Sequence, residues 1–312
     1  MKRFFIIALL VAVLLPNIAE AQRWKRYRKQ FIFGAGVTNF LGELGGSDKE
    51  GRDFIYDVDL VSTRPSLLVG YRYQLNSFLF LRGNLNWGVL RGDDKNTKEI
   101  ARRGRNLSFR SGFVEADFMA EFYLIQNARG NLYNLRGVRG RSGLQMDVYL
   151  FGGLGYMYFN PKAEYQGTYI ALQPLGTEGQ GLPGGPDKYK RTTFTIPYGI
   201  GVGKSIDRYW AINAEFTMRK TFTDYIDDVS TVYYGQKEIY AAKIAQGASE
   251  ASAERSRALS DPNIYSELGH LAEGVNLEGE QRGDPSDNDA FMTVMFSLSY
   301  KLVKRRKSRP KF

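Results

Sequence analysis

The sequence predicts an all-β protein, an eight-stranded antiparallel transmembrane β-barrel with long extracellular loops and one loop helix. Three observations lead to this prediction: an export signal, eight alternating segments of membrane-crossing length, and connections that are short and long in turn. A strand needs roughly 9–11 residues with one apolar face to cross a bilayer. The slightly negative mean hydropathy is compatible with this, because a barrel alternates apolar and polar residues.

The first residues read as a signal peptide, 1–21. Lys2 and Arg3 give a basic start, 4–15 is an unbroken apolar run, and Ala19–Ala21 is a small-x-small cleavage site. The apolar run is shorter than the roughly 20 residues that a membrane-spanning helix needs. We therefore expect an exported protein that continues with a basic segment.

Eight later segments have the length and alternation of membrane strands. In chain order they are 30–40, 66–75, 78–90, 113–124, 145–159, 192–204, 208–220 and 290–302. The residues that we place on the lipid-facing side include Phe31, Phe33, Leu67, Val69, Leu85, Trp87, Val89, Phe118, Phe194, Phe216, Met218, Met292 and Phe296. Segment 145–159 is apolar on both faces, so its register stays open, as does that of 30–40.

Charged residues of both signs alternate with the apolar ones, which points them into the barrel. The set is Arg72, Arg82, Glu115, Asp117, Glu121, Glu215 and Arg219. An eight-stranded barrel has an interior that side chains fill. Buried charges must be paired to offset desolvation, so we interpret these residues as a neutralising lumen network and not as a pore or an active site.

Loop lengths give a predicted orientation. The short links at 76–77 and 205–207 read as periplasmic turns, and the longer link at 125–144 falls on the same side. The long connections, predicted to be extracellular, are 41–65, 91–112, 160–191 and 221–289. Both termini are then periplasmic, and the barrel domain covers 30–302.

Positive charge gathers on the predicted periplasmic side in three separate places. The N-terminal segment 22–29 carries five positive charges, the link 125–144 four, and the end of the chain, 301–312, seven, including the basic tail 303–312. The candidate partner-binding residues are Arg23, Lys25, Arg26, Arg28, Arg136, Arg139, Arg141, Lys304, Arg305, Arg306 and Lys307. Such a face attracts anionic lipid headgroups or an acidic protein; a solvated tail that only adds solubility is the alternative.

The last long connection differs in charge and pattern. Segment 221–289 has 14 acidic and five basic residues, and its part 237–259 reads as one helix rich in Ala and Glu. The sequence leaves open whether this segment is a lid or a disordered insert.

The residues for common catalytic and metal chemistry are scarce. The chain has no cysteine, and His270 is its one histidine, which excludes thiolate zinc sites and sites with several imidazoles. Acidic clusters at 92–94 and 224–230 lack the regular spacing of a calcium loop; loop capping is the favoured interpretation, and a catalytic acid–base pair among Asp224, Asp227 and Asp228 the less favoured one. We predict no enzymatic activity, no cofactor and no metal site.

Five stretches together resemble a known family. They are TNFLGELGGSDKEGRDF at 38–54, RNLSFRS at 105–111, YLFGGLGYMYFNPKAEY at 149–165, LQPLGTEGQG at 172–181 and RKTFTDYIDDVS at 219–230. In this order they are similar to the PorG-like family, the outer-membrane barrel component of the type IX secretion system of Bacteroidota. The resemblance runs from about residue 30 to 302.

The resemblance implies a role that composition does not show. It implies a small outer-membrane barrel that associates with a periplasmic ring of a PorK-like lipoprotein and a PorN-like protein, in a machine that exports proteases, adhesins and gliding-motility proteins. It implies no catalytic residues. We expect outer-membrane lipid as a further contact and no nucleic-acid partner.

Two other classes of function remain open at this stage. The barrel is an adhesin or surface-binding protein if 221–289 is a binding loop. It is a lipid-modifying enzyme or a protease if His270 and Asp227 carry chemistry.

Overall fold

The structure, a computed structural model, describes residues 27–44, 61–96, 100–126, 146–207, 209–268 and 277–303. Its strands are β1 (Lys29–Leu41), β2 (Arg64–Gln74), β3 (Leu79–Asp93), β4 (Ser108–Ile125), β5 (Asp147–Tyr165), β6 (Thr168–Ala171), β7 (Thr192–Ser205), β8 (Trp210–Thr221) and β9 (Ala290–Leu302). Its helices are the short 3-10 helix η3 (Asp94–Asn96), α2 (Ile100–Arg105), α3 (Gln236–Ala245) and α4 (Glu250–Ser260). The predicted signal peptide and His270 lie outside the described residues.

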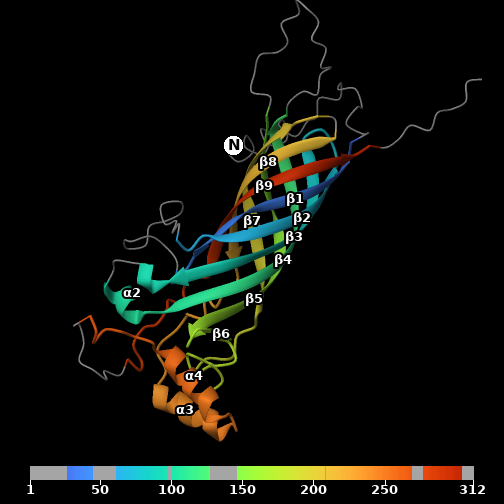
Figure 1. The fold of residues 1–312 in the computed structure, drawn as a ribbon. Coiled ribbons are helices and arrows are strands. Elements are labelled where there is room, and N and C mark those ends of the chain that lie inside the picture. Colours follow the sequence, from blue (N-terminus) through green and yellow to red (C-terminus); the bar gives the residue numbers. More distant parts are fainter. Residues whose placement is uncertain are drawn as a thin grey trace, which may run out of the picture.

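Eight of the strands close into one antiparallel barrel (Figure 1). The order is β4-β3-β2-β1-β9-β8-β7-β5, and β4 also pairs with β5, so the sheet has no free edge in the barrel. Closure lets each strand pair its backbone with a neighbour on both sides, which a bilayer requires. The predicted eight-stranded antiparallel fold is confirmed. Among the described residues, no helix is both long and apolar enough to cross a membrane.

Alternation along the strands gives the barrel an apolar exterior. Phe33, Val69, Phe118 and Phe296 are between 52% and 67% exposed, while a residue next to each along its strand is buried: Ile32, Leu68, Asp117 and Ser297. A soluble protein rarely shows a continuous apolar surface of this kind. The outward and inward faces therefore agree with the sequence prediction over the middle of the barrel.

The prediction that the outward side is exposed to lipid was wrong at the loop end of three strands. Val89, Met218 and Met292 were placed outward, but they are only 8%, 7% and 4% exposed. Met218 and Met292 are direct partners across β8 and β9, so each covers the other. Alternation cannot show where an apolar band ends, and near this end consecutive residues of one strand are buried on both faces.

The open registers are resolved by strand pairing. Phe31 pairs with Tyr71 and Phe33 with Val69, which points the aromatic face of β1 outward. In β5, Tyr149 and Phe151 are buried, and Leu150 and Leu154 are exposed. The inward rings of β5 were invisible to pattern analysis because both faces are apolar.

The connection 160–191 is more ordered than predicted. β5 continues to Tyr165 and turns back through Gln166 and Gly167 into β6. Both turn residues have positive φ, at 50° and 77°, as a two-residue hairpin turn with the right twist requires. Glycine suits the second position because it has no Cβ to clash there.

The prediction of a single loop helix was also wrong. Segment 237–259 forms two helices, α3 and α4, and α2 is a third in another loop. Gly247, at φ 81°, ends α3, with its N–H bonded to the Ile244 carbonyl and the Ala248 N–H bonded to the Lys243 carbonyl. This is a Schellman ending. Ser249 then caps α4 by accepting a hydrogen bond from the N–H of Ser252.

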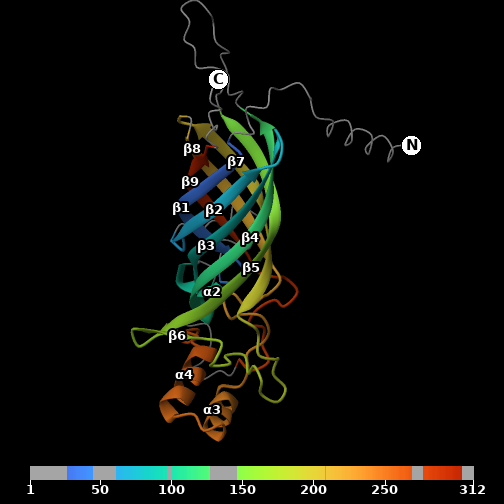
Figure 2. The same ribbon diagram turned by 90° about the vertical axis from the view of Figure 1, so that its right-hand side faces the viewer.

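The barrel has two unlike ends. The links 75–78 and 206–209 are short, and the first is tightened by Asn76, whose side chain accepts hydrogen bonds from the N–H groups of Phe78 and Leu79. The opposite end, here called the loop end, carries α2, α3, α4 and β6 (Figure 2). A buried apolar cluster closes the barrel there; it contains Phe40, Leu44, Leu90, Leu107, Phe109, Phe113, Met157, Phe159, Tyr189, Ile226, Val229 and Phe291.

Candidate functional sites: the barrel interior and the loop-end carboxylates

The residues predicted as a lumen network lie inside the barrel and contact one another. Arg72 reaches Glu121 at 2.7 Å, and Arg82 reaches Glu215 at 2.5 Å and Glu121 at 3.1 Å. Tyr149 of β5 donates to Glu215 at 2.6 Å. Arg82 and Glu121 lie on the neighbouring strands β3 and β4, whereas the other contacts join strands that are not neighbours and therefore cross the interior.

A second group of the same network lies nearer the loop end. Arg219 bonds Glu115 at 2.7 Å and donates to Thr293 at 2.8 Å, and Thr195 donates to Glu115 at 2.6 Å. Asp117 accepts hydrogen bonds from the side chains of Asn84 and Asn86. All seven predicted residues are thus brought together with polar partners.

Burial limits what the interior can do. Arg72, Arg82 and Arg219 are at most 2% exposed, and their guanidinium groups lie over the rings of Tyr149, Phe151 and Phe291 at 5.4–5.5 Å. A wide water-filled channel at this level would leave such side chains solvated. The interior at these residues is a packed ionic layer, which the structure forms from paired charges.

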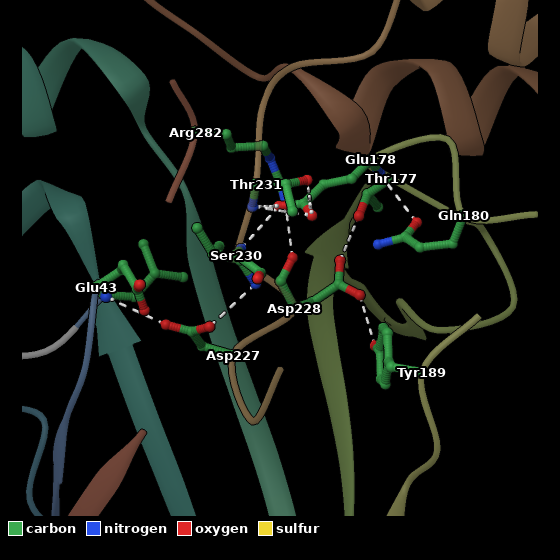
Figure 3. Close-up of polar contacts among 12 residues, drawn as sticks. Glu43, Thr177, Glu178, Gln180, Tyr189, Asp227, Asp228, Ser230, Thr231 and Arg282 are labelled. Atoms are coloured by element: carbon green, nitrogen blue, oxygen red, sulfur yellow. Dashed lines mark hydrogen bonds and ion pairs between the residues drawn. The ribbon is translucent and has the colours of Figure 1, made fainter. Parts of the chain in front are cut away.

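A second polar cluster lies at the loop end, among segments far apart in the sequence (Figure 3). We call it the loop-end cluster; it consists of Glu43, Glu178, Asp224, Asp227, Asp228, Arg282 and Asp289. Arg282 pairs with Glu178 at 2.8 Å and also donates to the carbonyl of Asp228 at 2.6 Å. Glu178 in turn accepts from the N–H groups of Ser230 and Thr231.

Asp227 and Asp228 act as loop caps within this cluster. Asp227 accepts hydrogen bonds from the N–H groups of Leu44, at 3.2 Å, and Val229, at 3.0 Å. Asp228, at φ 69°, accepts from the hydroxyl groups of Tyr189 and Thr177. These bonds fix residues 224–230 against the end of β1 and against the connection 172–191. Capping was the favoured interpretation of this acidic stretch.

Burial is the largest cause of the raised pKa values of the carboxyl groups in this cluster. Burial raises the pKa of Asp228 to about 6, although Arg282 opposes this rise. Burial, with the neighbouring charges of Glu43 and Asp224, holds the pKa of Asp227 well above its ordinary range. Burial likewise raises the pKa of Asp224 to about 8, and the neighbouring charge of Glu43 adds to the rise.

Sequence analysis missed four members of the cluster. Glu43, Glu178, Arg282 and Asp289 were given no role, although Glu43 and Glu178 lie within two of the stretches that resemble the family. A usable signal existed for Glu43 and Asp289, because one follows the first predicted strand and the other directly precedes the last. In a closed barrel the first and last strands pair, so these two positions fall on the same rim.

The predicted partner-binding residues lie almost entirely outside the described ranges. Arg28 is the exception: its guanidinium donates to the Tyr73 hydroxyl at 3.2 Å, at the end of the barrel with short links. The remaining ten fall in 1–26, 127–145 and 304–312. Their role as a docking surface stays a prediction.

Comparison with known proteins decides the family. Residues 5–241 match the family described as "Outer membrane protein beta-barrel domain". The chain belongs to this family. The protein is therefore an outer-membrane β-barrel, in agreement with its closed sheet and apolar exterior. No curated protein sequence matches the chain significantly.

Solved structures with similar folds are distant in sequence. This protein is similar to Ail, the attachment invasion locus protein of Yersinia pestis, with 9% sequence identity and a TM-score of 0.36. The match covers 88% of this chain and 99% of Ail. It is also similar to Neisserial surface protein A, with 8% sequence identity and a TM-score of 0.37, over 88% of this chain and 96% of that protein. A third similar structure is a major outer membrane protein from Thermus thermophilus, with 12% sequence identity and a TM-score of 0.34, over 88% of this chain and 99% of that protein. Likenesses at these levels carry no implication for function.

Proposed function

We propose that this barrel is a non-enzymatic outer-membrane component of the type IX secretion system that positions a periplasmic ring of PorK-like and PorN-like proteins. The proposal rests first on the five stretches that resemble the PorG-like family. It rests second on where these stretches lie in the structure and on which strand ends lead into the basic segments. The two supports are independent, because one is a matter of sequence and the other of topology.

The stretches that carry the resemblance meet in one place. Leu44, in the first stretch, bonds Asp227, in the last. Glu178, in the fourth, binds the backbone at Ser230, and Leu107 and Met157, in the second and third, share the apolar cluster at the loop end. Residues that build one folded unit support a shared architecture better than scattered matches do.

The observation that carries the docking proposal is where the basic segments join the barrel. Lys29 pairs with Leu302, so the N-terminal segment and the C-terminal tail leave the barrel from adjacent strand ends. Ile125 pairs with Val148, so the link 127–145 begins and ends on the same rim. Three positively charged segments on one rim favour an acidic protein surface or anionic headgroups as their contact.

The experiment compares two fourfold charge reversals. One changes Lys304, Arg305, Arg306 and Lys307 to Glu, on the proposed docking side. The matched control reverses four exposed residues at the loop end, Arg103, Lys188, Lys190 and Lys237. Native pull-downs from gently solubilised outer membranes are then analysed for the ring proteins at low and high salt.

We expect the tail variant to lose ring capture at least tenfold and the control to keep it, with wild-type capture weakening as salt rises. Equal capture by both variants at every salt concentration contradicts docking through the basic rim. A wild-type barrel that purifies alone under gentle, low-salt conditions contradicts the secretion role itself.

An adhesin is the second candidate, favoured by the order of the loop end. Leu172, Leu175 and Leu259 share a buried cluster with Ala163, which packs α4 against the β5–β6 hairpin and makes a firm platform. Deleting 236–260 distinguishes the two proposals. In an adhesin the deletion abolishes surface binding, whereas a secretion component that docks through the basic rim keeps ring capture and export.

A further inference from the structure

Three carboxylates converge where three neighbouring strands end. Glu43 follows β1, Asp224 follows β8 and Asp289 directly precedes β9, and these strands are adjacent in the order β1-β9-β8. One carboxylate oxygen from each residue lies within 4.8 Å of the other two. Asp224 and Asp289 are buried and Glu43 is half-buried.

Unpartnered oxygens give the second and independent observation. Asp224 is 8% exposed and Asp289 2%, and within the described chain neither oxygen of Asp224 nor Oδ1 of Asp289 accepts a hydrogen bond within 3.5 Å. A buried acceptor without a partner is costly, so native proteins rarely leave one unsatisfied. Both residues place one carboxylate oxygen in the space that the three side chains share.

The remaining oxygens hold the group in position. Asp289 Oδ2 accepts from the N–H of Ile226 at 2.8 Å, and Glu43 Oε1 accepts from the N–H of Asp284 at 3.1 Å. Each of these two side chains is thereby anchored through one of its carboxylate oxygens. A ligand sphere is commonly arranged in this way, with outer hydrogen bonds orienting the inner donors.

The cations on the described residues near the cluster have other partners. Arg105 attracts Glu43 but bonds Asp94 at 2.8 Å, and Arg282 pairs with Glu178. Asp227 adds a further carboxylate beside Asp289 and Glu43. Like charges at this separation in a buried site repel strongly, so the arrangement favours a positive ion among them.

We propose that Glu43, Asp224 and Asp289 bind one Ca²⁺ ion. Carboxylate oxygens are the donors that calcium prefers, at about 2.3–2.6 Å, so two donors on one ion lie at most about 5 Å apart. Zinc favours nitrogen and sulfur donors, and magnesium demands a smaller and more regular site. The sequence suggested no metal site because the three ligands come from separate strand ends and form no local motif.

The bound ion ties three strand ends together. It holds the start and the end of the connection 222–289 to the end of β1, beside the apolar cluster that closes the barrel. The site thereby makes the fold of the loop end dependent on calcium. This inference concerns the loop end and does not depend on the proposed contact of the basic rim with a secretion ring.

The test uses the full chain refolded into a non-ionic detergent and treated with EDTA, so that no anionic lipid competes for cations. Titration calorimetry with CaCl₂ should give saturable binding of about one ion per chain. The variants Asp224→Asn and Asp289→Asn should weaken it at least tenfold. Asp287→Asn is the matched control, because it makes the same change two residues away on an exposed side chain.

Limited proteolysis within 222–289 gives a second readout, with the heat-dependent gel shift of the barrel verifying that each variant is folded. Calcium should protect this segment in the wild type and in Asp287→Asn only, and MgCl₂ at the same concentration should protect it less. Absence of saturable binding, or equal binding by all four proteins, overturns the proposal. One further result overturns it: in EDTA the two Asn variants are better protected than the wild type, and calcium does not change the protection of the wild type. Shared protons would then hold the cluster together.

Discussion

Arg82 of β3 and Glu215 of β8 form a two-pronged contact across the barrel interior, with Nη1 and Nη2 at 2.5 Å and 3.0 Å from the two carboxylate oxygens. The two strands are separated in the barrel by β2, β1 and β9 on one side. The pair therefore bridges opposite walls. Both side chains are at most 2% exposed, so the charges depend on one another.

The first prediction concerns this pair. Arg82→Ala leaves Glu215 with less compensation in a desolvated interior, and we expect a loss of about 3–5 kcal/mol in the free energy of unfolding. The double variant Arg82→Met with Glu215→Leu removes both charges and should be less destabilised than the single variant. Urea unfolding in detergent, followed by tryptophan fluorescence, measures the difference.

A matched control uses an exposed pair in a loop. Arg257 and Glu254 are in contact at 2.5 Å on α4, but their side chains are 39% and 42% exposed. Arg257→Ala should change the free energy of unfolding by less than about 1 kcal/mol. Equal effects of the two Arg→Ala variants would contradict the view that the lumen network supports the barrel.

Much of the barrel can be predicted from the sequence, because successive side chains of a strand point alternately into the barrel and out of it. Arg82 and Glu215 were assigned inward for that reason alone. Which acid faces which arginine was not predictable, because it depends on how strands far apart in the chain are staggered around the barrel. Tyr149 shows the same limit, since its inward side could not be chosen in a strand apolar on both faces.

The loop end was harder to predict, for a different physical reason. Its contacts join residues such as Glu178 and Ser230, which belong to separate connections and share no periodicity. Such pairs become visible only when closure of the barrel brings the connections together. Local signals did exist for the break between α3 and α4, where Gly247 is followed two residues later by the capping Ser249.

The second prediction is a pH dependence of the loop end through Asp228. Its pKa is raised from 3.8 to about 6, so the folded state binds the proton more tightly than the unfolded state between these values. The contribution of Asp228 to stability is therefore fully present below pH 4 and is lost as pH rises through 6. The upper bound of this change is about 3 kcal/mol.

The measurement is proteolytic protection of 222–289 between pH 4 and 8 in EDTA, so that bound cations do not contribute. Asp228→Asn should reduce the pH dependence between 4 and 6, because an amide does not titrate there, and asparagine tolerates the positive φ at this position. An unaltered pH profile in this variant would assign the dependence to the other carboxylates of the cluster.

The last prediction concerns Gly153, at the seam where β4 and β5 close the barrel. A Cβ at this position would lie 2.1 Å from the carbonyl oxygen of Phe118 and 2.8 Å from the Cα of Met119, which are backbone atoms of the facing strand. Gly153→Ala must therefore push the two strands apart. We expect it to slow barrel folding and to lower stability by more than about 1 kcal/mol, as overpacking does.

Gly112, in β4 near the loop end, is the matched control, because an added Cβ meets nothing within 4 Å there. Gly112→Ala should leave stability unchanged or raise it slightly, since alanine loses less backbone entropy on folding. Refolding yields and urea midpoints of the two variants measure the contrast, and a Gly153→Ala barrel as stable as Gly112→Ala would contradict a tightly packed seam.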